Sequence, residues 1–478
     1  MTRETTPIEQ QNEVSQAVMG IHKIKSVFRL TLGLLAVFIA VYALAQGNQQ
    51  ERFFQGGTLP EADGFVHMGV ATCASSVCHG QPSASEQDNV LMTEYRTWLN
   101  QDLHSRAYNS LLTPASRLMA ENLGLEQPPH RAKICLDCHT DNVPESLRGE
   151  EFLLSDGVGC EACHGGSENW LDSHRENSTH QDNISRGLFP TENPFAQATL
   201  CLSCHNGSDT KLASHLIMGA GHPRLSFELE AYSALQPAHY RVDEDYRERK
   251  NALVGLGVWI TGQLEMAMQS LELINTYVVD NDSMQSELYF YDCQACHHPL
   301  EDKRWIPGQH ANLPPGTIRL NDSSFQMVTS LLEVVSIDRV PEMNRLLNLL
   351  HQASVVSKPA IRNAAENLHA YIEGISLQFS TREYTGDELR RIRRNLIQHA
   401  ANGDYRDYAV AEQALMAIDG ITIRLQQADQ YESVLDALFQ AMVLEDFGER
   451  GFVLFNADRF VRIARQVDQY FADDSSNK

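Results

Sequence analysis

All ten cysteines of the chain occur in pairs, and a histidine directly follows the second cysteine of every pair. Four pairs are separated by two residues and one pair by four. Two thiols on one short turn can add to the two vinyl groups of a haem, and the next imidazole can then bind the iron as an axial ligand. The pattern therefore predicts a covalently attached haem c at each pair. The cysteines are Cys73, Cys78, Cys135, Cys138, Cys160, Cys163, Cys201, Cys204, Cys293 and Cys296, and the proximal histidines are His79, His139, His164, His205 and His297.

A zinc ribbon and structural disulfides are the alternatives to haem attachment. A zinc ribbon would use the cysteine pairs two at a time, which leaves the histidine after every pair unexplained. A disulfide across two residues would be strained and easily reduced. The longer loop between Cys73 and Cys78 could close as a disulfide, but His79 stands where the other motifs place their ligand. We therefore expect five haem c groups, each with one iron.

The second axial ligand of each iron decides between electron transfer and catalysis. Fourteen of the 19 histidines remain for this position. His351, His369 and His399 lie on helical patterns near the C-terminus, and His22 precedes the apolar N-terminal segment. Two histidines on every iron would give low-spin haems suited to electron transfer, whereas an iron with one histidine would be open to a substrate. The candidates are His67, His104, His130, His174, His180, His215, His222, His239, His298 and His310.

Three longer segments surround several of these histidines: WLNQDLHSRAY at 98–108, GVGCEACHGG at 157–166 with WLDSH at 170–174, and HLIMGAGHPRL at 215–225. They resemble the cytochrome c-554 family, and the resemblance covers roughly residues 65–305. It implies c-type haems in close stacked pairs that pass electrons, and distal ligands at His104, His174, His215 and His222. The chain departs from the tetrahaem pattern in its stretched first motif, its fifth motif and its long C-terminal tail, so the substrate and partners of that family do not carry over.

The fifth distal ligand is predicted to be His298. Because this residue directly follows His297, it cannot reach the far face of the same haem and would have to bind a neighbouring iron. His239, His130 and His67 are its rivals for this position. The glycines at 219 and 221 and the proline at 223 interrupt any helix between His215 and His222, so these two can point at different irons.

The N-terminus predicts export. Basic residues precede an uncharged stretch that runs from Leu30 to Gln50, which places the N-terminus in the cytoplasm and the haem motifs in the periplasm. With Val27 and Phe28 the apolar stretch approaches the roughly 20 residues that cross a bilayer. We expect a single-pass anchor in a bacterial inner membrane. A cleaved signal peptide ending at Ala43-Leu44-Ala45 is the alternative.

The sequence predicts a mainly α fold with few strands. Residues 1–26 form a cytoplasmic arm, 27–46 the anchor, 47–320 a pentahaem domain with little regular structure, and 321–478 an all-α bundle. The tail has no cysteine, and apolar residues recur in it at helical spacing. The expected helices are Phe325 to Ile337, Pro341 to Val355, Ile361 to Phe379, Glu388 to Ala401, Tyr405 to Gln426, Tyr431 to Phe447 and Phe455 to Phe471.

These features together predict a membrane-anchored electron-transfer protein. Its partners would be a redox donor and acceptor, including subunits of a quinol-oxidising or respiratory complex. The net charge of −24 argues against nucleic acid and anionic lipid, and would suit a cationic redox partner, although solubility alone explains it. The alternative is an oxidoreductase with one open haem that acts on a small nitrogen or sulfur compound. Tyr108, His180 and Arg224 are acid and base groups that such a site could use, but the sequence singles out no catalytic residue.

Overall fold

The chain divides into two compact units, Met1–Gly56 and Gly57–Lys478. The computed structural model describes residues 58–85, 90–175, 178–241, 243–244, 246, 256–280, 287–298, 313–443, 445–446 and 453–476. The predicted arm and anchor, residues 1–46, and His310 lie outside these ranges. Within them, no helix is long and apolar enough to cross a membrane.

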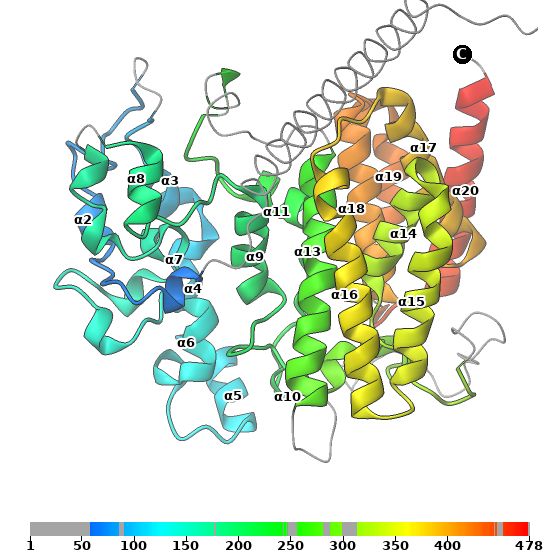
Figure 1. Cartoon of the computed structure of the whole chain (residues 1–478), viewed down its shortest axis with the longest axis horizontal. Coiled ribbons are helices and arrows are strands. Elements are labelled where there is room, and N and C mark those ends of the chain that lie inside the picture. Colours follow the sequence, from blue (N-terminus) through cyan, green and yellow to red (C-terminus); the bar gives the residue numbers. More distant parts are fainter. Residues whose placement is uncertain are drawn as a thin grey trace, which may run out of the picture. The chain divides into compact units, whose positions relative to one another are not determined.

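Residues 58–241 contain short helices joined by long irregular connections (Figure 1). Prolines at the first turn and side-chain caps start several of them: Thr113 accepts a hydrogen bond from the backbone of Ser116, and Asn193 caps the helix that begins at Pro194. The helices are α2 (Val70–Cys73), α3 (Glu94–Gln101), α4 (Ala107–Ser110), α5 (Pro114–Asn122), α6 (Lys133–His139), α7 (Cys160–His164), α8 (His180–Ser185), α9 (Pro194–His205), α10 (His215–Gly219) and α11 (Leu229–Leu235).

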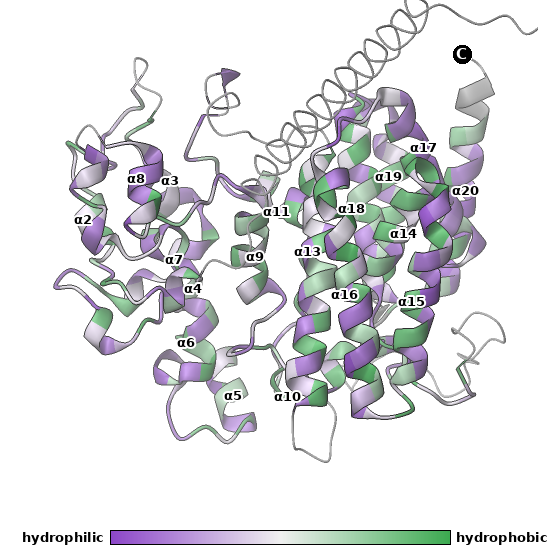
Figure 2. Ribbon diagram, in the orientation of Figure 1, coloured by the Kyte–Doolittle hydropathy of each residue, from purple (hydrophilic) through white to green (hydrophobic). Residues whose placement is uncertain are grey.

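The rest of the described chain is dominated by long helices, which confirms the prediction of a mainly α fold. Figure 2 shows both polar and apolar residues along these helices, as expected for helices that bury one face. One short antiparallel hairpin, β1 (Glu445–Asp446) and β2 (Val453–Leu454), precedes the last helix. The helices are α13 (Gly257–Ile274), α14 (Ser323–Val335), α15 (Val340–Ala353), α16 (Lys358–Ser380), α17 (Gly386–Asn402), α18 (Tyr408–Arg424), α19 (Ala428–Met442) and α20 (Ala457–Ser476).

Local signals in the sequence set the ends of these helices. The predicted cap at Thr385 is a full capping box, in which Thr385 and Glu388 each accept a hydrogen bond from the other's backbone N–H. Gly403 ends the same helix with a φ of 86°, a left-handed conformation that glycine adopts without strain. Pro341 lies in the first turn of α15, as predicted.

Helix α13 belongs to the core of the bundle, although it precedes residue 321. It packs against α14 and α16, and its buried Trp259, Ile260 and Leu264 join one hydrophobic cluster with Phe325 and Ile372. The same helix also packs against α9, which carries the cysteine pair at 201 and 204. The bundle therefore supports the cysteine-bearing segments directly. The domain boundary at 320 itself stays a prediction.

Candidate haem-binding sites

We number the five cysteine pairs, each with its following histidine, in chain order: site 1 (Cys73, Cys78, His79), site 2 (Cys135, Cys138, His139), site 3 (Cys160, Cys163, His164), site 4 (Cys201, Cys204, His205) and site 5 (Cys293, Cys296, His297). In sites 2, 3 and 4 the histidine is the last residue of α6, α7 and α9. Helical geometry then joins its N–H to the carbonyl of the first cysteine, four residues earlier. Site 5 makes the same hydrogen bond from a tight turn, His297 N to Cys293 O at 2.8 Å.

The stretched motif of site 1 keeps this relation. His79 N donates to Cys73 O over 3.3 Å, although six residues rather than four separate the two groups. The extra residues form a turn that closes on Gly80, whose position leaves no room for a side chain because a Cβ there would lie 1.9 Å from the carbonyl oxygen of Ala74. The turn therefore accommodates the two extra residues, and His79 keeps the backbone hydrogen bond to the first cysteine that the other sites have.

Each of the five proximal histidines faces a second histidine from a distant part of the chain. The rings are separated by 6.2 or 6.3 Å between centroids in all five cases, whereas the angle between ring planes varies from 13° to 89°. The pairs are His79 with His174, His139 with His222, His164 with His239, His205 with His104, and His297 with His215.

This spacing is the one that a metal between two imidazoles requires. Metal–imidazole nitrogen bonds are about 2.0–2.1 Å long. The centre of a five-membered ring with bonds of about 1.33 Å lies about 1.1 Å from each ring atom. Two such rings on opposite sides of one metal therefore have centroids about 6.3 Å apart. Rotation about each metal–nitrogen bond leaves this spacing unchanged, so the varied ring angles are compatible with it.

Four of the five facing histidines are those that the sequence resemblance suggested: His104, His174, His215 and His222. The fifth is His239, opposite His164, rather than the predicted His298. None of the five pairs among the described residues contains His298, His130 or His67. The geometry therefore favours His239, which the sequence ranked only as a rival.

Hydrogen bonds divide the histidines into two groups. In the described part of the chain, four histidines of the facing pairs make ring hydrogen bonds through Nδ1: His79 to Glu94 at 3.0 Å, His104 to Asp102 at 2.9 Å, His139 to Ala107 O at 3.1 Å and His222 to Pro223 O at 2.8 Å. These acceptors need a proton on Nδ1, which leaves the Nε2 lone pair for a metal.

Several histidines outside the pairs use Nε2 itself. His67 is fully buried, with Nδ1 2.7 Å from Asp141 and Nε2 3.2 Å from Pro60 O. His351 and His369 bond Asp322 and Glu272 through Nε2 at 3.0 and 3.1 Å. These rings have a hydrogen-bonding role that competes with metal binding. Among the rivals for the fifth position, His67 is therefore disfavoured on chemical grounds.

Burial and carboxylates shift the histidine pKa values in opposite directions. Burial lowers the pKa of His164 and of His205 to about 4, which keeps both rings neutral and able to bind a metal. Glu94 raises the pKa of His79, and Asp102 raises that of His104. Although burial opposes ionisation of Asp102, its hydrogen bonds with His104 lower the carboxyl pKa to about 2.

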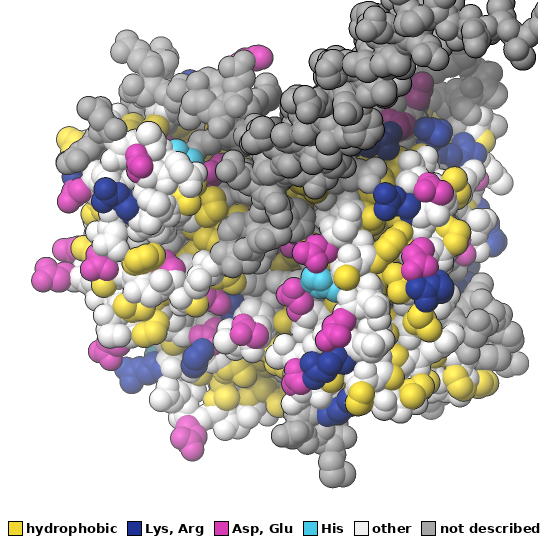
Figure 3. Space-filling model, in the orientation of Figure 1, with side chains coloured by type: hydrophobic (Ala, Val, Ile, Leu, Met, Phe, Trp, Pro, Cys, Tyr) yellow, Lys and Arg dark blue, Asp and Glu magenta, His cyan; other side chains and the backbone are white. Residues whose placement is uncertain are grey.

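The cysteines and their surroundings fit covalent haem. All ten cysteines are unpaired, including the two of site 1, for which a disulfide was the alternative. Large apolar side chains are exposed beside the facing histidines: Val77, Leu103 and Leu216 are 77%, 75% and 70% exposed. Figure 3 shows further hydrophobic side chains at the surface of one face. Apolar side chains at these positions can pack against a porphyrin.

The sites are neighbours in space. Cys73 of site 1 lies within hydrogen-bonding reach of Cys160 of site 3, and Cys138 of site 2 within reach of Cys204 of site 4. Cys163 of site 3 is close enough to Cys201 to interact electrostatically with it. Sites 1, 3, 4 and 2 therefore form a connected series.

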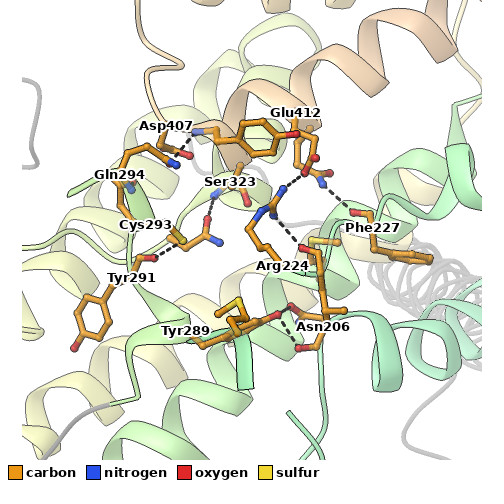
Figure 4. A pocket seen from close by; sticks show the side chains of 18 of the residues that line it. Asn206, Arg224, Phe227, Tyr289, Tyr291, Cys293, Gln294, Ser323, Asp407 and Glu412 are labelled. Atoms are coloured by element: carbon orange, nitrogen blue, oxygen red, sulfur yellow. Dashed lines mark hydrogen bonds and ion pairs between the residues drawn. The ribbon is translucent and has the colours of Figure 1, made fainter. Parts of the chain in front are cut away.

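Site 5 joins this series at site 4. A cavity of about 720 Å³, open space included, is lined by His205 of site 4 and by Cys293 of site 5 (Figure 4). Tyr289 links the two sites. It precedes Cys293 in the chain, and its hydroxyl donates a hydrogen bond to the backbone carbonyl of Asn206, the residue after His205, over 2.9 Å. Arg224 lines the same cavity, where its guanidinium pairs with Glu412 of α18 and lies 4.9 Å from the centre of the Tyr408 ring.

The comparisons agree with this chemistry over part of the chain. Residues 72–165 match the family model described as cytochrome c554 and c-prime. That segment contains sites 1, 2 and 3, and the match supports a c-type cytochrome with covalently attached haem that takes part in electron transfer outside the cytoplasm. No curated protein and no solved structure matches the chain.

The acid and base groups named from the sequence do not gather at one place. Tyr108 lies edge-on to His130, with ring centroids 6.5 Å apart, His180 pairs with Glu192, and Arg224 pairs with Glu412. Sequence reasoning missed Glu94 and Asp102, the carboxylates behind two of the facing histidines. Asp102 had a local signal, since Asp at two residues before His104 can cap the turn that presents it, and the backbone N–H of His104 does donate to it over 3.0 Å. Glu94 had none.

Proposed function

We propose that the chain is a pentahaem c-type cytochrome that passes electrons between redox partners through haems with two histidine ligands each. The observation that carries this proposal is the set of five facing histidine pairs, each with one member from a cysteine-pair motif and a spacing of 6.2–6.3 Å. The family match over residues 72–165 supports the same class.

The residues have three roles in this proposal. The ten cysteines form the thioether bonds, and His79, His139, His164, His205 and His297 are the proximal ligands. His174, His222, His239, His104 and His215, in the same order, are the distal ligands. Iron bound in this way supplies reversible one-electron chemistry. The chain's own contribution is to fix both imidazoles by burial and by Nδ1–H hydrogen bonds, so that little rearranges when an electron arrives.

The facing histidines also bear on the alternative of an enzyme. An open haem needs a proximal histidine without a partner ring, and each of the five proximal histidines in the described chain has one. The cavity lined by His205 and Cys293 could admit a small molecule, but the histidines of both sites already have partner rings, His205 with His104 and His297 with His215. The arrangement therefore favours a relay.

The cellular setting of the proposal rests on the N-terminal sequence. We propose that residues 27–46 anchor the chain in the inner membrane and that the haem sites face the periplasm, where donor and acceptor are redox proteins. The acidic net charge of −24 suits a basic partner. A mature N-terminus near Met1 and a need for detergent are expected, whereas a mature N-terminus at Gln46 would identify a cleaved signal peptide.

Mass spectrometry and electron paramagnetic resonance test the core of the proposal. The denatured chain should carry five covalent haem masses. The oxidised protein should show low-spin ferric haem only, and the reduced protein should bind little carbon monoxide. A clean high-spin signal that responds to nitrite or hydroxylamine would instead support the oxidoreductase, and four haems with a Cys73–Cys78 disulfide would remove site 1.

A further inference from the structure

The acceptors behind the facing histidines differ in charge from site to site. At site 1 the Nδ1–H of His79 donates to the carboxylate of Glu94 over 3.0 Å, and at site 4 that of His104 donates to Asp102 over 2.9 Å. At site 2 both rings have neutral acceptors. His139 donates to Ala107 O over 3.1 Å and His222 to Pro223 O over 2.8 Å.

Both carboxylates are fixed in place. The other carboxylate oxygen of Glu94 accepts a hydrogen bond from the backbone N–H of Met92 over 2.9 Å. Asp102 is 5% exposed and also accepts hydrogen bonds from the backbone of His104 and, over 3.1 Å, from Gln236 at the end of α11. Neither carboxylate can swing away to solvent without breaking these bonds, so each is a permanent negative neighbour of its histidine.

A carboxylate behind an axial histidine changes the iron that the histidine binds. The hydrogen bond draws the Nδ1 proton toward the acceptor and makes the ring a stronger donor, which stabilises ferric iron over ferrous iron. A neutral carbonyl does this to a smaller extent. The negative charge itself also favours the oxidised haem, because oxidation adds a positive charge to the site.

We propose that Glu94 and Asp102 set the order of haem potentials, by holding sites 1 and 4 low while site 2, with neutral acceptors only, is higher. This inference rests on the proposed function, because it assumes a haem between each histidine pair. Site 2 adjoins site 4 through Cys138 and Cys204, so an electron that reaches site 4 passes downhill to site 2.

Two further buried charges lie beside these sites. Beside sites 1 and 3, the buried Glu161 accepts backbone hydrogen bonds from Met68, Gly69 and Ser167 at 2.7–2.8 Å. Beside sites 2 and 4 lies a buried cation, Lys211, which pairs with Glu61 and donates to Asp137 O over 3.3 Å. Glu161 therefore adds negative charge on the side of site 1, whereas Lys211 is paired with Glu61 and lies beside both site 2 and site 4, so it does not separate the potentials of these two sites.

Redox titration of the purified full-length, haem-loaded chain tests the proposal. Glu94→Gln and Asp102→Asn should each move one midpoint potential upward and leave the other four in place, with haem content and low-spin signals unchanged. Glu272→Gln is the matched control. Glu272 lies on α13, its side chain is 65% exposed, and it pairs with His369 of α16, a histidine that belongs to no facing pair.

A reciprocal variant covers the case in which a carboxylate substitution prevents folding. The hydroxyl of Ser110 lies 2.9 Å from His139 Nδ1 at the surface, so Ser110→Asp should lower the potential of site 2 alone. Unchanged potentials in all three variants with full haem content would overturn the inference and leave the relay intact. Missing haems or high-spin iron in the unmodified chain would instead overturn the proposed function.

Discussion

The choice between His239 and His298 as the fifth distal ligand is the sharpest test of the histidine pairs. His239 lies 6.2 Å from His164 between ring centroids, within about 0.1 Å of the spacing that a shared metal needs. His298 stands outside the five pairs, beside His297 in the sequence. Replacing His239 by alanine should therefore open site 3, whereas replacing His298 should open none.

The expected size of the effect follows from the count of sites. His239→Ala should convert one ferric haem in five, about a fifth of the low-spin signal, to a high-spin signal, and the reduced protein should then bind one carbon monoxide per chain. Imidazole added to the solution should restore the low-spin state, because it can occupy the vacated position. His298→Ala should retain all five low-spin haems.

Electron paramagnetic resonance of the two oxidised variants measures how many haems become high-spin. Carbon monoxide titration of the reduced variants measures how many haems have an open position. Total haem is measured on the same samples, so that loss of a haem is not mistaken for loss of a ligand. If His298→Ala opened a haem and His239→Ala did not, the ring spacing would be a poor guide to ligation and the other four assignments would lose their support.

Three further outcomes test separate parts of the structure. Burial raises the pKa of Glu265 to about 8, so folding favours the protonated form of this carboxyl group. The free energy of unfolding should therefore fall as the pH rises from about 4.5 to 8. Chemical unfolding at pH 5 and pH 8.5 should show that Glu265→Gln removes this fall in stability. Phe325→Ala, at a position 1% exposed in the bundle core, should lower the unfolding free energy by about 3–5 kcal/mol, whereas Ile423→Ala, at a position 56% exposed, should change it by less than about 0.5 kcal/mol. Serine at both Cys73 and Cys78 should remove one haem mass from the denatured chain, and an unchanged mass would exclude haem attachment at site 1.

The long helices of the tail were predictable because their signals are local. Apolar spacing of three to four residues marks the buried face, and Pro341 and Thr385 mark helix starts that the structure confirms. The predicted helix from Tyr431 to Phe447 was too long. α19 ends at Met442, and a short strand follows at Glu445 because it pairs with Leu454, a contact that the sequence pattern does not reveal.

The sequence predicts the cysteine motif of each candidate site better than it predicts the facing histidine. The cysteines and proximal histidine are fixed within a few residues of one another, so their spacing alone predicts them. The facing histidine comes from far along the chain, as His104 does for His205 and His239 for His164. Sequence can count such histidines but cannot pair them, because pairing depends on how the long irregular connections fold. His298 was predicted to bind a neighbouring iron, with His239 among its rivals, and the ring geometry instead favours His239 opposite His164.

Site 5 shows why the boundary between cytochrome and bundle was hard to draw. Its motif is clamped by residues on both sides of position 320: Asp292 N donates to Arg319 O over 2.9 Å, and Tyr408 N donates to the side chain of Gln294 over 3.1 Å. Arg319 in turn pairs with Asp407, the residue that caps α18, over 2.8 Å. The sequence pattern changes after the last cysteine, but site 5 is held both by its own turn and by the first residues of α18. These contacts tie site 5 to the start of α18, so the bundle is part of the scaffold that holds this site.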